Sequence, residues 1–261
     1  MPQSYAVALQ RFLEKSSERK ILEQADRVQP VNNLTHSCKL WNELTFFLNG
    51  TAGKLAENLD KLQAKGRVIL PPAENMFRAL ELTPLHQVKI VIIGQDPYPT
   101  PGDAHGLAFS YVGKRRLPAS LKAILKEVAR DLSMPVTQKG DLTFWAQQGV
   151  LLLNSALSVE AGKAGSHLKF GWNPLIEEII RNISNRDNPT VFMLWGNSAR
   201  KYVANIDKER HLVLETGHPS PLNRLRDFEG CAHFSKANAW LRTKGREPVD
   251  WFSTAQETQE I

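Results

Sequence analysis

Three polar side chains that could act on a bound ligand each follow a short apolar run of the sequence. Asp96 comes behind VKIVII, Asn154 behind VLLL and His218 behind HLVL. A carboxylate can orient or deprotonate water, an imidazole can donate to developing negative charge, and an amide can read a planar edge with one donor and one acceptor. Together they favour a water-dependent reaction beside a planar base such as a pyrimidine.

Each of these residues also has an ordinary structural explanation. An Asp before a proline more often caps a helix or turn, and an Asn behind a strand more often bonds its own backbone. His218 could be a core histidine bonded to a backbone carbonyl. Phe109 and Tyr98 could supply a stacking face and a wall, although most aromatics at such places are core. These alternatives stay open at this point.

The elements that must position these residues can be predicted from the apolar pattern. Four runs without alternation, at 88–93, 150–153, 190–194 and 211–214, predict strands buried on both faces. Helical patterns lie between and after them, at Ser120–Leu132, Pro174–Ile183, Ser198–Val203 and Ser235–Arg242. This alternation predicts an α/β fold, a three-layer sandwich whose central, mainly parallel four-stranded sheet is flanked by helices on both faces. The polar residues behind the strands should then meet at one sheet edge, where open α/β sheets bind ligands.

The composition limits the classes of protein. Hydrophobic residues at 42% and charged residues at 23% exclude a wholly disordered chain. No apolar run approaches the ~18 residues of a membrane span, and the first 20 residues lack a signal-peptide core, so we expect a soluble, non-exported protein without a membrane partner. A net charge of +6 favours a polyanionic partner. Cys38 and Cys231 have no metal-type spacing, which favours a reducing compartment and gives zinc no support.

The 261 residues fit one large domain with short tails. We expect a helical extension at 1–35, a single catalytic domain at 36–252 and a polar tail at 253–261. In the extension, Leu9, Phe12 and Leu13 have helical spacing, and the charged stretch SSERK at 16–20 predicts a break after them.

Long blocks of the sequence resemble the signature blocks of the major family of uracil-DNA glycosylases. They are Gly94–Ser110 (GQDPYPTPGDAHGLAFS), Gly149–Ser158 (GVLLLNSALS), Leu194–Ala199 (LWGNSA) and His218–Leu222 (HPSPL). The similarity runs in family order over roughly residues 60 to 252, and no counterpart is recognised for 1–35. It implies a monofunctional enzyme without metal or cofactor that removes uracil from DNA as the first step of base-excision repair.

The resemblance also implies roles in the base pocket. Asp96 would orient or activate the attacking water, and His218 would hydrogen-bond the uracil O2 as it gains negative charge. Asn154 would read O4 and N3–H, and Phe109 would stack on the ring. Two further pocket residues are Gln95, which would line it, and Tyr98, which would press where the thymine methyl group would lie.

A second set of residues would contact DNA outside the pocket. Leu222 would enter the space vacated by the flipped nucleotide. Small-residue loops let backbone N–H groups approach phosphates, and the residues implied there are Pro118, Ser120, Gly196, Ser198 and Ser220, with Arg226 retained nearby.

The sequence departs from the family pattern at several places. Pro99 stands where many members carry histidine, and Ala119 replaces a proline. NRLRDFEG at 223–230 replaces the usual SAHRGFFG, so that Asp227 and Glu229 add negative charge beside Leu222. We therefore expect weaker or more salt-sensitive binding of duplex DNA.

The implied partners are uracil-containing single- and double-stranded DNA and a proteinaceous inhibitor that mimics DNA, with a monomer as the expected state. The expected location is the bacterial cytoplasm with the nucleoid, or the nucleus in a eukaryote. Three alternatives each require a different sequence feature. A binding protein without turnover would lack the water-directing carboxylate, an enzyme for another base would carry a small residue at 98 or an acid at 154, and a nucleotide hydrolase would need a phosphate-binding glycine loop that GQDPYP does not provide.

Overall fold

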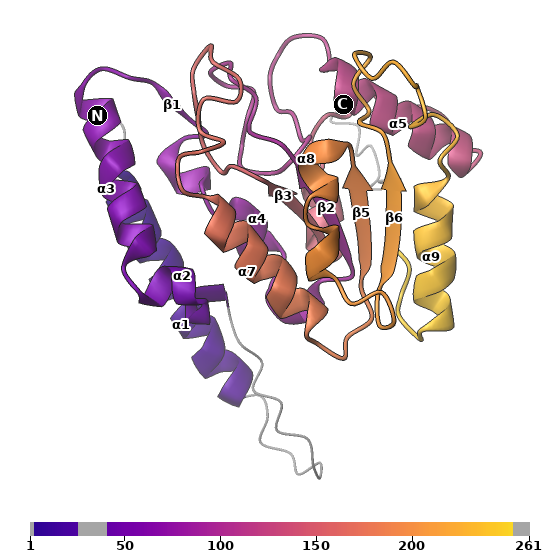
Figure 1. Cartoon of the computed structure of the whole chain (residues 1–261), viewed down its shortest axis with the longest axis horizontal. Helices are drawn as coiled ribbons and strands as arrows, with labels where there is room; N and C mark the ends of the chain where they lie inside the picture. The colour runs from indigo at the N-terminus through magenta and orange to yellow at the C-terminus, as the bar shows by residue number, and fades with distance from the viewer. Residues whose placement is uncertain (1–2, 26–40, 253–261) are drawn as a thin grey trace, which may run out of the picture.

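The computed structural model describes residues 3–25 and 41–252, and a four-stranded parallel sheet lies at its centre (Figure 1). The strands are β2 (Ile90–Gly94), β3 (Val150–Asn154), β5 (Val191–Trp195) and β6 (Leu212–Thr216), in the spatial order β3-β2-β5-β6. The chain leaves β2 toward β3 and leaves β5 toward β6, on opposite sides. The order therefore reverses between β2 and β5, and the carboxyl ends of these two strands mark the expected ligand crevice.

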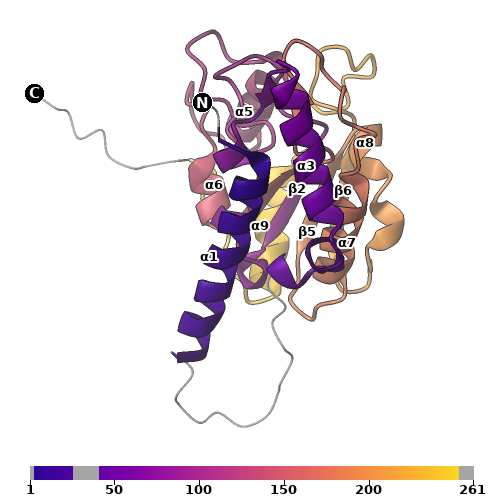
Figure 2. The same cartoon turned by 90° about the vertical axis from the view of Figure 1, so that its left-hand side faces the viewer.

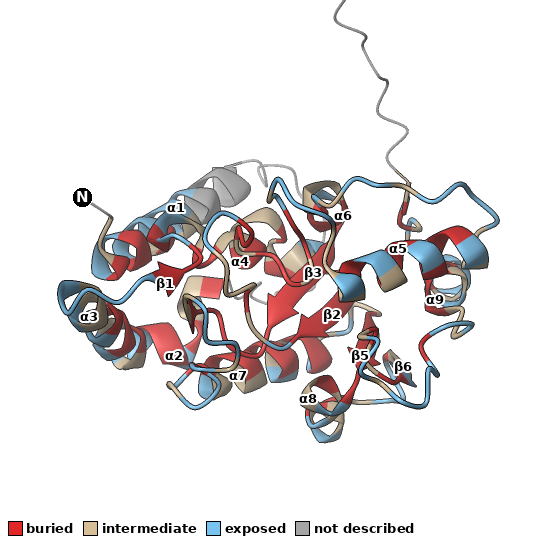
Figure 3. Ribbon diagram, turned by 90° about the horizontal axis from the view of Figure 1, so that it is seen from above, coloured by how far each residue is buried: buried red, intermediate tan, exposed pale blue. Residues whose placement is uncertain are grey.

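Helices cover both faces of this sheet, so the predicted three-layer fold is confirmed (Figure 3). In that view α4 (Arg78–Leu82) and α6 (Thr143–Gln147) lie on one side and α7 (Asn173–Ser184) on the other. The remaining α-helices are α1 (Tyr5–Ala25), α2 (Thr45–Leu48), α3 (Thr51–Ala64), α5 (Ala119–Asp131), α8 (Asn197–Arg200) and α9 (His233–Thr243). A small antiparallel pair, β1 (Ile69–Leu70) with β4 (Val159–Glu160), was not predicted. Strands of two residues leave no periodic signal in a sequence.

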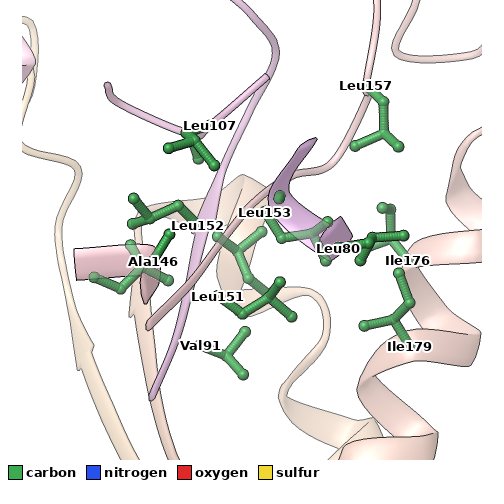
Figure 4. Packing of buried hydrophobic residues seen from close by; sticks show 14 of the residues in the cluster. Leu80, Val91, Leu107, Ala146, Leu151, Leu152, Leu153, Leu157, Ile176 and Ile179 are labelled. Carbon is green, nitrogen blue, oxygen red and sulfur yellow. The ribbon is translucent and has the colours of Figure 1, made fainter. Parts of the chain in front are cut away.

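Three strands of the sheet are buried on both faces, as the runs without alternation predict, since all five residues of β2, β3 and β5 are buried. The prediction is wrong for the fourth run, because β6 lies at the edge of the sheet and its first three residues are only partly buried. Figure 4 shows Leu151 and Leu153 of β3 on the side of Ile176 and Ile179 of α7, with Leu152 on the other side. Because successive side chains of a strand alternate, both faces need an apolar cover, and the helices supply it.

The predicted break at SSERK is wrong, because α1 runs through it to Ala25. Ser16 and Ser17 donate from their hydroxyls to the carbonyls of Phe12 and Leu13, at 2.9 and 3.0 Å. Such i−4 bonds allow serine inside a helix. The charged stretch therefore does not end the helix.

Helix α1 packs beside α3 (Figure 2). Tyr5, Leu9 and Phe12 are buried in the same apolar cluster as the sheet. The Phe12 ring stacks on Phe77 at a centroid distance of 4.8 Å. The division at residue 35, Cys38 and the tail at 253–261 fall outside the described residues, so the predicted domain boundaries stay predictions.

Candidate active site

A cleft of about 660 Å³ opens at the carboxyl ends of β2 and β5, where the strand order reverses. The sequence-predicted residues that line it are Gln95, Asp96, Tyr98, Phe109, Ser120, Asn154, Gly196, His218, Ser220 and Leu222. The loops that carry them lie at the upper edge of the sheet in Figure 1. Residues from five separate parts of the chain therefore converge on one site, as the strand ends predict.

Asp96 is held in place from two sides. Its Oδ2 accepts a hydrogen bond from the backbone N–H of Gly165 at 2.5 Å, and its Oδ1 accepts one from Nε2 of Gln95 at 3.1 Å. Gly165 lies 69 positions along the chain, so Asp96 is no local cap of a helix or turn. The carboxylate is fixed at the cleft wall, where it can hold a water molecule.

The loop that carries Gly165 is itself attached beside the cleft. The backbone N–H of Gly162 donates to the carbonyl of Pro99 at 2.7 Å. Pro99, in place of the usual histidine, thus helps to hold the loop that supports Asp96. Sequence reasoning missed Gly165, because a backbone donor leaves no side-chain signal.

Asn154 ends β3 and lies opposite Gly94 at the end of β2. Its side chain packs over Gly94, where a Cβ atom would collide with Asn154 Oδ1. Asn154 is 6% exposed, and among the described residues none makes a hydrogen bond to its side-chain amide. The amide lines the cleft, so the edge of a planar ligand there can pair with its donor and its acceptor. Asn154 therefore does not form the local backbone bond of a turn asparagine.

His218 has a defined orientation. Its Nδ1 accepts a hydrogen bond from the backbone N–H of Ser220 at 3.0 Å, rather than contacting a carbonyl as a core histidine would. A neutral imidazole that accepts at Nδ1 carries its proton on Nε2. Burial lowers the pKa of His218 below its ordinary value, so the ring is neutral at pH 7. Nε2–H is then a neutral donor available to a ligand.

Phe109 and Tyr98 form one aromatic wall. Phe109 has φ of 63°, a left-handed conformation that is uncommon for a residue with a Cβ atom. Its carbonyl accepts a hydrogen bond from the Tyr98 hydroxyl at 2.8 Å. Burial raises the pKa of Tyr98, so the hydroxyl stays protonated. The Phe109 ring centroid lies 5.9 Å from that of His218, beside the space where a flat base would stack.

Three sequence-predicted residues lie outside the cleft. Pro118 directly precedes α5, and Ser198 on α8 donates to Oε1 of Gln95 at 3.4 Å. Arg226 is exposed, with φ of 49°, and lines a second cavity next to the cleft. These positions surround the cleft entrance without reaching the base-sized space.

The loop after β6 is braced by a residue whose role the sequence did not indicate. Asp227 Oδ2 accepts from the backbone N–H of Gly217 at 2.9 Å, and its Oδ1 accepts from Nδ2 of Asn223 at 2.7 Å. The Asn223 bond lowers the pKa of Asp227, which is therefore a carboxylate at pH 7. The brace holds Leu222 and Leu225 outward, 90% and 82% exposed. The loop at 223–230, which departs from the family pattern, is therefore held in place by its own hydrogen bonds.

Within residues 3–25 and 41–252, no group of three or more His, Cys, Asp or Glu side chains is placed to hold a metal ion. No helix in the same ranges is long and apolar enough to cross a membrane. The chemistry that the cleft itself offers is a fixed carboxylate, a neutral imidazole donor, an amide edge and a stacking face. These groups are suited to hold one planar base with a water molecule beside it.

Comparison with curated proteins points to the same class. The chain is 51% identical to the uracil-DNA glycosylase of Chromobacterium violaceum over 213 residues, which cover 80% of this chain and 88% of the relative. It is 49% identical to the uracil-DNA glycosylase of Rhizobium meliloti over 205 residues, which cover 78% and 85%.

Solved structures agree with the fold. A mimivirus uracil-DNA glycosylase superposes with a TM-score of 0.71 at 26% identity, covering 79% of this chain and 81% of that one. A mimivirus UNG variant in complex with UGI gives a TM-score of 0.73 at 26% identity, covering 79% and 86%. The family model described as the uracil DNA glycosylase superfamily matches residues 80–242. The chain belongs to this superfamily.

Proposed function

We propose that this protein is a monofunctional uracil-DNA glycosylase, which hydrolyses the bond between uracil and deoxyribose in DNA and leaves an abasic site. One observation carries the proposal. Asp96, Asn154 and His218, from three separate strand ends, line one cleft with a carboxylate, a free amide and a neutral imidazole. Hydrolysis of a bond to a pyrimidine needs a group that directs water, a group that binds the edge of the base and a donor to the charge that the base gains. These three residues supply them.

Hydrolysis begins with a nucleotide turned out of the stack, because the bond cannot be reached inside a duplex. Asp96 orients a water molecule and accepts its proton while the water oxygen bonds to the sugar C1′. The bond from C1′ to N1 breaks, and uracil leaves with the electron pair as an anion. His218 donates from Nε2 to the uracil O2, where that charge gathers, and such a donor contributes ~3–4 kcal/mol in a dry site.

Base choice follows from two contacts. Asn154 matches the O4 acceptor and N3–H donor of uracil, whereas cytosine presents an amino group and an unprotonated ring nitrogen there. Tyr98, fixed by its bond to the Phe109 carbonyl, occupies the space that the thymine methyl group needs. Phe109 stacks on the ring, and Gln95 links the pocket to Ser198. Uracil is the pyrimidine that satisfies both contacts.

DNA binding belongs to the residues around the cleft entrance. Ser120, Gly196 and Ser220 lie at its rim with Leu222 beside them, and Pro118, Ser198 and Arg226 lie further out. We propose that the residues at the rim and those further out hold the phosphates. Leu222 fills the gap left by the flipped nucleotide. Both single- and double-stranded DNA fit this arrangement.

Partners and location are part of the same proposal. A related mimivirus protein was solved with UGI, and we propose that a DNA-mimicking protein inhibitor can occupy this surface as well. We propose a monomer without metal or cofactor that works with chromosomal DNA, in the cytoplasm of a bacterium or the nucleus of a eukaryote.

The decisive experiment measures free base released from a single-stranded oligonucleotide with one deoxyuridine, in EDTA. Oligonucleotides with only thymine or cytosine test base choice. Asp96→Asn should lower kcat about 10³-fold, because the amide cannot accept the proton. Asp187→Asn is the matched control, since the Asp187 side chain is 82% exposed and precedes β5 at the opposite sheet edge.

Tight binding of the oligonucleotide by the wild-type protein with no release of uracil would contradict the proposed function and favour a uracil-DNA binding protein without turnover. Release that stops in EDTA would instead contradict the metal-free mechanism.

A further inference from the structure

A second groove, of about 540 Å³, lies beside the base cleft. The exposed face of α5 forms one wall, and residues 218–229 of the loop after β6 form the other. His218 and Ser220 line both cavities, so one thin wall separates them. A DNA strand that leaves the cleft at Ser220 meets this groove next.

The groove is positively charged. Four basic side chains line it, namely Lys122, Lys126, Arg130 and Arg226, and all four are exposed. In the part of the chain that the structure describes, Lys122, Lys126 and Arg226 form no ion pair. Three cations are therefore free to meet an anionic ligand.

One of the two lining carboxylates is turned inward. Glu127 is 2% exposed, pairs with Arg130 at 2.8 Å and accepts from the backbone N–H groups of Gly230 and Ala232 at 2.9 and 3.0 Å. Burial alone would raise the pKa of Glu127, but these hydrogen bonds lower it to about 2. Its charge is neutralised within the fold, so Glu229 is the one lining acid that faces solvent.

The spacing of the α5 cations suits a polymer. Lys122, Lys126 and Arg130 are four residues apart on one helix, so they lie in a row with steps of about 6 Å. Arg130 is held by Glu127, which leaves Lys122 and Lys126 as the free cations of this row. Their separation of about 6 Å corresponds to about two phosphate steps of one DNA strand along the helix axis. With Arg226 on the opposite wall, three free cations can meet several phosphates of one strand, whereas a small anion would meet only one of them.

We infer that this groove binds the phosphate backbone of the duplex arm next to the flipped nucleotide. The inference rests on the proposed function and adds a duplex-specific surface on α5, at residues that carry no role in the chemistry. Its contacts lie beyond the cleft entrance, so DNA too short to reach α5 gains nothing from them.

The test compares Lys122→Gln/Lys126→Gln with Lys61→Gln/Lys65→Gln, a control pair with the same charge change and spacing at the end of α3. Uracil release is measured over a range of salt on a duplex of about 25 base pairs and on a trinucleotide with a central deoxyuridine. On the duplex, kcat/KM of the α5 variant should fall about tenfold at about 0.1 M salt, and its log–log salt slope should decrease by about 1 to 2. The control pair should match the wild-type protein on both substrates.

Several outcomes would overturn the inference. They are an unchanged duplex rate, an equal loss on the trinucleotide, and an equal loss in the control pair. A wild-type protein that releases no uracil from the trinucleotide or from the longer single strand would instead refute the proposed function. The two failures are therefore distinguishable.

Discussion

The base cleft and the loop after β6 hold their side chains in opposite ways. In the cleft, Asp96 is tied to the backbone of Gly165, and Asn154 is buried over Gly94 at the ends of paired strands. In the loop, a carboxylate brace presents Leu222 and Leu225 almost fully to solvent. Contacts within the protein fix the cleft side chains, whereas Leu222 and Leu225 are left exposed for a partner, which we propose is DNA.

This difference separates two kinds of effect. A change in the cleft should lower the rate of bond cleavage on every substrate, since the same groups meet the base each time. A change at the loop or along α5 should alter binding, salt dependence and the preference for duplex DNA. Single substitutions and a pH profile can test that separation.

Asn154→Asp should lower uracil release about 10²- to 10³-fold, because a carboxylate cannot donate to O4 in a buried pocket. The loss should be equal on single-stranded and duplex DNA, and release of cytosine should rise relative to that of uracil. Both are measured as free base from oligonucleotides. Asn58→Asp on the exposed face of α3 is the control. A loss confined to duplex DNA would contradict the separation of cleft and loop.

The pH dependence of kcat should report the lowered pKa of His218. For an imidazole with the ordinary pKa of about 6.5, the neutral fraction would fall about 30-fold between pH 7.5 and pH 5. Because burial lowers this pKa, the neutral donor persists as pH falls through 6.5 and is lost only further down. We therefore expect a much smaller decline in kcat over that range, measured on the single strand under saturating substrate. An inflection at pH 6.5 or above, absent in His218→Ala, would disprove the assignment.

Leu222→Ala should raise KM for duplex DNA about 30-fold, because a leucine buried in the DNA stack contributes ~2 kcal/mol. On a short single strand no stack has to be filled, so the rate should change less than twofold. Leu48→Ala is the matched control, since Leu48 is 72% exposed at the end of α2. Equal losses on both substrates would assign Leu222 to the cleft instead.

Glu229→Gln should have the smallest effect, a decrease in duplex KM of about two- to threefold at low salt. The reason is that it removes the solvent-facing acid of the α5 groove. The gain should vanish at high salt, and Glu57→Gln on α3 should show none. An increase in KM would mean that Glu229 supports the loop rather than repelling phosphates.

The sequence predicted the sheet and the convergence of its strand ends because buried parallel strands are uninterrupted apolar runs. It missed the last residue of β2, β3 and β5 and the last two residues of β6, because backbone pairing continues past the apolar runs into Gly94, Asn154, Trp195 and Thr216. Asp96, Asn154 and His218 were predictable because they lie within one to four residues of the ends of these runs. The resemblance to the family then supplied their roles.

What could not be predicted depends on the backbone or on distant partners. Gly165 supports Asp96 through an N–H group that any residue possesses. Asp227 looked like an added charge on an exposed loop, whereas its carboxylate binds Gly217 and Asn223. Whether that charge also weakens duplex binding stays a prediction.

Gly196 gives the cleft a property that no single contact describes. It has φ of 79°, and a Cβ atom there would lie 2.8 Å from Cβ of His218. The turn at Gly196, proposed to hold a phosphate, therefore lies directly against His218, proposed to meet the base. Any side chain at position 196 would push into His218, so the closeness of the phosphate site to the base pocket depends on a residue that has no side chain.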